Sequence, residues 1–80
     1  MDKETLKVKQ LSFTIFEKIL LDGEYQNKQE ILLKAVKLSK EARNKNAPKS
    51  FILAQDEALK MIKNLSFEEI KEIIAILKND

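Results

Sequence analysis

The sequence offers few side chains that could carry out catalysis or bind a metal. It contains no cysteine and no histidine, so it lacks a thiol nucleophile and the imidazole that often serves as acid, base or metal ligand. The adjacent acids Asp56 and Glu57 point about 100° apart on a helix and cannot form a carboxylate dyad, and the same holds for Glu68 and Glu69. We therefore expect a protein that is not an enzyme and that binds no cofactor.

Basic side chains are concentrated in the middle of the chain. Residues 28–49 contain seven Lys or Arg and two acids, whereas the whole chain has a net charge of only +2. Such a segment can attract a nucleic acid or another anionic surface. The side chains that could make these contacts are Lys34, Lys37, Lys40, Arg43, Lys45 and Lys49.

Two features favour an ordinary solvated helix face for this basic segment. Glu30 stands four residues before Lys34, and Lys37 stands four residues before Glu41, which is the spacing of ion pairs on one helix. All four phenylalanines are predicted to lie on apolar helix faces, which leaves no exposed aromatic ring to stack on a base. They are Phe13, Phe16, Phe51 and Phe67. Accessory nucleic-acid binding is therefore the alternative function and not the main prediction.

Three large apolar residues interrupt the polar faces of the predicted helices. If Leu33, Leu53 and Ile76 converge, they form a patch that suits a second copy of the chain or another protein. A chain of 80 residues gains from such a contact, because a domain of this size buries only about two-thirds of its unfolded surface. The main prediction is a small, non-catalytic protein–protein interaction or regulatory module that self-associates.

Apolar residues recur with helical spacing in four segments, and capping residues mark their limits. Ser66 and Glu69 have the spacing of a capping box at the start of the last segment, and Asn27 with Glu30 repeats that arrangement. Gly23, the only glycine, is placed to end the first helix in a left-handed conformation.

These patterns predict an all-α protein: a compact bundle or orthogonal array of four short amphipathic helices in a single helical domain, residues 1–80. The expected helices cover residues 4–21, 28–43, 49–63 and 67–78. One glycine and one proline leave little material for strands and tight turns. Gln55 falls inside the apolar arc of the third helix, so its amide should hydrogen-bond within the core or lie at the edge of the core.

Size, lysine-rich composition and the expected bundle make the chain similar to the small bacteriocin immunity proteins. That resemblance implies toxin neutralisation as a third possible function. A single arginine among 15 Lys and Arg residues indicates an AT-rich genome, and we expect a bacterial source. No apolar run has the length of a signal peptide or the roughly 20 residues of a membrane span, so we expect a cytoplasmic protein.

Overall fold

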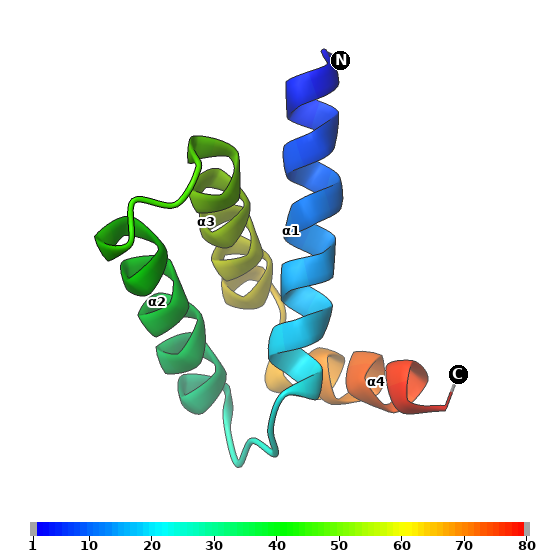
Figure 1. Ribbon diagram of the computed structural model, residues 1–80. Coiled ribbons are helices and arrows are strands. Elements are labelled where there is room, and N and C mark those ends of the chain that lie inside the picture. The colour runs from blue at the N-terminus through cyan, green and yellow to red at the C-terminus, as the bar shows by residue number, and fades with distance from the viewer. Residues whose placement is uncertain (1, 80) are drawn as a thin grey trace.

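Residues 2–79 fold into four α-helices, and the predicted all-α fold class is confirmed. The computed structural model describes residues 2–79. Figure 1 shows its helices, which are α1 Lys3–Leu21, α2 Lys28–Asn44, α3 Lys49–Asn64 and α4 Phe67–Lys78. Each boundary lies within one residue of its predicted position. Within the described residues, no helix is both long enough and apolar enough to cross a membrane.

Side-chain caps fix where α2 and α4 begin. Ser66 Oγ accepts a hydrogen bond from the N–H of Glu69 at 3.1 Å, and the Glu69 carboxylate accepts one from the N–H of Ser66 at 2.9 Å. The capping box predicted at α4 is therefore confirmed. At α2, Asn27 Oδ1 accepts from the N–H of Glu30 at 3.1 Å, but the Glu30 carboxylate accepts from the N–H of Gln26 instead of returning to Asn27. Only half of the second predicted capping box is formed.

The end of α1 differs from its prediction. Gly23 does not adopt a left-handed conformation, so the glycine cap predicted there is wrong. The carbonyl of Ile19 accepts a hydrogen bond from the N–H of Asp22 at 3.4 Å and another from the Tyr25 hydroxyl at 2.5 Å. Tyr25 therefore satisfies one of the carbonyl groups that every helix leaves free in its last turn.

The left-handed cap occurs instead at the end of α2. Asn46 has a φ angle of 54°, a region that Asn visits more readily than most other residues because its short polar side chain can hydrogen-bond locally. The N–H of Asn46 donates to the carbonyl of Arg43 at 3.2 Å, and the N–H of Ala47 donates to the carbonyl of Ala42 at 3.0 Å. This pair of hydrogen bonds is a Schellman motif, and it ends α2 just before Pro48.

The helices form an array in which α3 packs against both α1 and α2. In Figure 1, α1 runs downwards, α2 returns upwards and α3 runs downwards again. α1 and α2 meet mainly near their connecting loop and diverge from it, while α4 crosses the C-terminal end of α1. The predicted compact arrangement of four helices is confirmed for the described residues, with α1, α2 and α3 running up and down and α4 lying across the end of α1 (Figure 1).

One apolar core is shared by all four helices. Its largest fully buried apolar side chains are Ile19 and Leu20 from α1, Ile31 from α2, Ile62 from α3 and Ile70 from α4. Small residues are also fully buried on α1 and α3, namely Ser12, Ala54 and Ala58. The Ser12 hydroxyl donates to the carbonyl of Lys9 at 2.6 Å. The hydroxyl is therefore buried with its hydrogen-bond donor satisfied.

Two residues assigned to the apolar face of α1 lie outside this core. Leu6 is 49% exposed and Phe13 is 51% exposed. α4 packs near the C-terminal end of α1 (Figure 1), where Phe16 and Leu20 are buried. Helical spacing shows which residues share a face, but the length and position of the neighbouring helix decide how much of that face is covered. The prediction that Phe13 is a core residue is therefore wrong.

Candidate functional site

The three apolar residues predicted to form a patch are all exposed, but they lie on three different helices. Leu33 on α2 is 65% exposed, Leu53 on α3 is 46% exposed and Ile76 on α4 is 64% exposed. Leu53 lines a depression of about 390 Å³ with Val8 and Lys7, beside the first turns of α1. Because α4 lies at the opposite end of α1 (Figure 1), the structure does not bring Leu53 and Ile76 together. An intermolecular contact through these residues stays a prediction.

Lys34, one of the six basic residues predicted to contact anions, forms an ion pair within the protein. Its Nζ lies 3.0 Å from Asp22 Oδ2, which ties α2 to the end of α1. The hydrogen bond and the negative charge of Asp22 raise the pKa of Lys34. Lys34 therefore does not pair with Glu30, and the predicted pair of Lys37 with Glu41 is also not formed within residues 2–79.

Arg43 is engaged in a network that joins α2 to α3. Its Nη2 lies 2.6 Å from Asp56 Oδ2, and its Nη1 lies 3.1 Å from Asp56 Oδ1. Ser39 Oγ accepts from Arg43 Nη1 at 2.5 Å and donates to Asp56 Oδ1 at 2.9 Å. The hydrogen bond from Arg43 lowers the pKa of Asp56, although burial acts in the opposite direction. No sequence pattern predicts this pair, because the partner lies 13 residues away on another helix.

The remaining basic residues predicted to contact anions face the solvent. They are Lys37, Lys40, Lys45 and Lys49, and none forms an ion pair with another residue that the structure describes. A nucleic-acid phosphate would have to compete with Asp22 for Lys34 and with Asp56 for Arg43. The free basic surface is therefore smaller than the sequence indicates, which weakens the nucleic-acid alternative.

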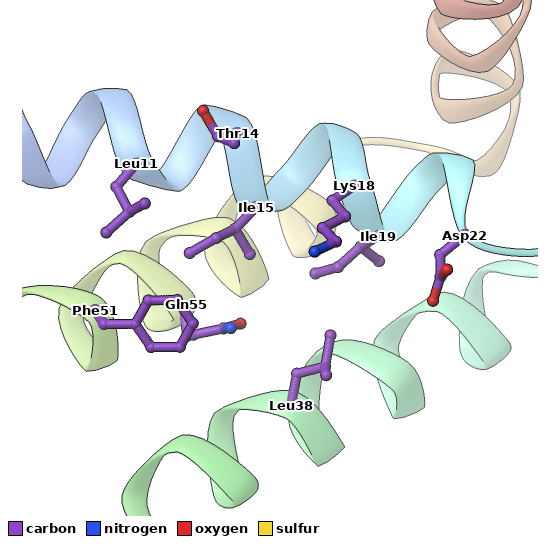
Figure 2. A pocket seen from close by; sticks show the side chains of 9 residues that line it. All are labelled: Leu11, Thr14, Ile15, Lys18, Ile19, Asp22, Leu38, Phe51 and Gln55. Atoms are coloured by element: carbon purple, nitrogen blue, oxygen red, sulfur yellow. The ribbon is translucent and has the colours of Figure 1, made fainter. Parts of the chain in front are cut away.

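A groove opens between α1 and α2, with α3 as its floor (Figure 2). Its volume is about 370 Å³, within the roughly 300–1,000 Å³ that is usual for ligand pockets. It follows from the array, because α1 and α2 both pack on α3 but diverge from each other. The lining side chains are Leu11, Thr14, Ile15, Lys18, Ile19 and Asp22 from the α1 side, Leu38 from α2, and Phe51 and Gln55 from α3.

Gln55 brings a buried polar group to this apolar groove. Its side chain is only 5% exposed, and its Oε1 accepts no hydrogen bond from any residue between 2 and 79. Figure 2 shows the amide pointing into the groove, toward the space between Ile19 and Leu38. A buried polar atom without a partner destabilises a protein by about 1–3 kcal/mol. Gln55 is thus buried and its oxygen is left without a hydrogen bond, so neither of the two predicted arrangements is formed.

One end of the groove carries charged side chains. Asp22 is occupied by its ion pair with Lys34, and the hydroxyl of Thr14 donates to a backbone carbonyl of its own helix at 3.2 Å. The Lys18 ammonium group lies over the groove (Figure 2) and has no ionic partner among the described residues. A ligand in the groove would therefore meet the cation of Lys18, whereas the oxygen of Gln55 is buried.

An apolar groove with a cation at one end can orient a ligand. The hydroxyl of Thr14 would need an adjacent base before it could act as a nucleophile. In the part of the chain that the structure describes, no acidic cluster could hold a metal ion. A comparison of the chain with protein-family models, with curated proteins and with solved structures found no match.

Proposed function

We propose that this protein is a non-catalytic binding module that holds an apolar anchor of a partner protein in the groove between α1 and α2. The observation that carries the proposal is the groove itself, which has a volume of about 370 Å³ and is lined mainly by apolar side chains, with the Lys18 ammonium group over it (Figure 2). Apolar lining with a few placed polar groups is the usual composition of a specific binding site.

The shape of the groove favours a partner with helical structure. Leu11, Ile15 and Ile19 stand four residues apart, so they form one ridge along α1 about 12 Å long. Phe51 and Leu38 complete the apolar lining on α3 and α2. A groove bordered by such ridges accepts the apolar face of an amphipathic helix, whose anchors recur at the same spacing.

The groove is distinct from the surface predicted to mediate self-association. Leu33, Leu53 and Ile76 do not line it, so partner binding and self-association can be tested by separate substitutions. Self-association, a regulatory role and a cytoplasmic location stay predictions made from the sequence.

A library of helical peptides, selected on the wild-type protein, tests the proposed function. The selected peptides are then measured against Leu38→Phe, which fills the groove, and against Leu33→Phe, the same change at an exposed position of α2. We expect Leu33→Phe to bind like wild type and Leu38→Phe to bind roughly tenfold or more weakly, which is a loss of about 1.4 kcal/mol. Peptides that bind all three proteins equally would place the docking surface elsewhere and contradict the proposal.

A further inference from the structure

We infer that the exposed face of α1 binds the same face of a second copy of the chain, with the two α1 helices antiparallel. The inference starts from Leu6 and Phe13, two large apolar side chains of α1 that are about half exposed. They stand seven residues apart, so they point within about 20° of each other and lie about 10 Å apart along the helix. Neither residue lines the groove, so this surface is separate from the proposed binding site.

This face of α1 is covered at one end and open at the other. Leu20 continues the line of Leu6 and Phe13 by another seven residues, and it is fully buried near α4, which crosses this end of α1 (Figure 1). Apolar residues that recur every seven positions are typical of helices that pack side by side. The line is therefore one helix-packing stripe, and its N-terminal part has no helix packed on it within the described residues.

The charges beside the stripe make it complementary to a second copy of itself. Lys3 and Glu17 are exposed on the same side of the stripe, and neither forms an ion pair with another residue that the structure describes. In an antiparallel pair centred between residues 9 and 10, Leu6 lies level with Phe13 of the second copy. Lys3 then lies within about one residue of the level of Glu17 of the second copy. Two-fold symmetry forms each of these contacts twice.

The same charges exclude a parallel pair. A parallel arrangement would place Lys3 beside Lys3 and Glu17 beside Glu17, and like charges beside a helix seam are unfavourable. On the other side of the stripe, Asp2 caps its own helix by accepting a hydrogen bond from the N–H of Thr5 at 2.8 Å. Lys9 of each copy would lie near the two-fold axis, where its long side chain can carry the ammonium group out to water. The opposite charges at the two ends of the stripe therefore favour the antiparallel orientation.

The contact should give a weak dimer. Two helices that meet along a few turns bury less than the roughly 1,200–2,000 Å² of a stable interface, so we expect a dissociation constant on the order of 0.1 mM. Sedimentation of the wild-type protein should therefore show a change from monomer to dimer between about 10 µM and about 1 mM. A monomer throughout this range would overturn the inference.

Two serine substitutions test which surface forms the dimer. Phe13→Ser should raise the dissociation constant roughly tenfold or more, because it removes the largest apolar side chain of the contact. Leu33→Ser removes an exposed apolar side chain from α2 and should dimerise like wild type. Phe13 is exposed in the monomer, so the helix content of Phe13→Ser at low concentration should match wild type. Wild-type dimerisation of Phe13→Ser, or loss of the dimer in Leu33→Ser, would overturn the inference.

Charge reversal tests the antiparallel orientation. Lys3→Glu and Glu17→Lys each bring like charges together in the antiparallel pair and should weaken the dimer severalfold at low salt. The double variant restores opposite charges and should dimerise like wild type. Neither change opposes the helix dipole, because the new acid lies at the start of α1 and the new base lies toward its end. A double variant that dimerises no better than the two single variants would show that these charges do not meet, and would overturn the inference.

Discussion

α1 meets two neighbours in two different ways. Against α3 it forms a closed seam, where Ser12, Ala54 and Ala58 are fully buried. Toward α2 it leaves a groove, where Ile15 and Leu38 line a cavity of about 370 Å³. The seam and the groove lie on adjacent sides of one helix and differ mainly in side-chain size and in the direction of the neighbouring helix.

This difference shows how a small protein can divide one helix between stability and binding. Small side chains let two helix backbones approach, and large ones keep them apart. Apolar side chains in the seam are already buried in the unbound protein, so their burial stabilises the fold and cannot contribute to binding. The half-buried side chains of the groove, Leu11, Leu38 and Phe51, can still gain from burial, at roughly 25 cal/mol per Å² before association costs.

The largest expected effect contrasts a core residue with a groove residue. Ile62 is fully buried, so Ile62→Ala should reduce the free energy of unfolding by about 2–5 kcal/mol, which includes the cavity that it leaves. Leu38→Ala, on the half-buried wall of the groove, should reduce it by less than about 1.5 kcal/mol. Denaturant unfolding measures both changes. Similar losses at the two positions would show that the groove is closed in solution and that the contrast is wrong.

Gln55→Leu should stabilise the protein, whereas the two preceding substitutions should destabilise it. Removal of an unpaired buried oxygen should raise the free energy of unfolding of the unliganded protein by about 1 kcal/mol. The exposed control Gln29→Leu should change it by less than about 0.5 kcal/mol. Thermal or denaturant melts without ligand make the comparison. A loss of stability in Gln55→Leu would mean that the oxygen is already hydrogen-bonded in solution.

A smaller, pH-dependent effect is expected where α2 meets α3. Arg43 holds the pKa of Asp56 below its usual value, so the ionised carboxylate stabilises the fold above about pH 4 and this contribution is lost as pH falls through the lowered pKa. The two side chains are 50% and 41% exposed, so solvent screening should keep the loss of stability in Arg43→Gln small at neutral pH.

Unfolding curves at a series of pH values test this expectation for Asp56. The difference between wild type and Arg43→Gln should shrink as pH falls below about 4, because the carboxylate is then protonated in both proteins. Lys40→Gln removes a positive charge from the same helix without breaking the network and should keep the wild-type pH dependence. A constant difference at all pH values would indicate that Arg43 acts through packing alone.

The smallest effect on stability is expected outside both regions. Leu33, Leu53 and Ile76 are exposed, so changing each to Ser should alter the free energy of unfolding of the monomer by less than about 0.5 kcal/mol. Self-association through these residues would instead appear as a shift toward monomer in sedimentation of the triple variant. If the triple variant keeps the wild-type mass in sedimentation, the predicted intermolecular contact is wrong. If it loses much of its stability, the three residues belong to the core.

Features set by neighbours in the sequence were predictable, and features set by neighbours in space were not. Ser66 and Glu69 stand three residues apart, so the start of α4 could be predicted from the chain alone. The Arg43–Asp56 pair and the exposure of Phe13 depend on which helices lie side by side, which no local spacing encodes. Gln55 was recognisable as a polar residue on an apolar face. The groove that it enters depends on the divergence of α1 and α2, so its role became visible only in the structure.

The folding of the loop between α1 and α2 can be followed by absorbance, because the Tyr25 hydroxyl in this loop donates a hydrogen bond to the carbonyl of Ile19. Tyr25 is the only tyrosine in a chain without tryptophan, so near-ultraviolet absorbance of the ionised phenol arises from one place. Burial raises the pKa of Tyr25, which means that the folded loop retains the phenolic proton at a pH where an unfolded chain would release it. An alkaline titration therefore reports whether the loop between α1 and α2 is folded.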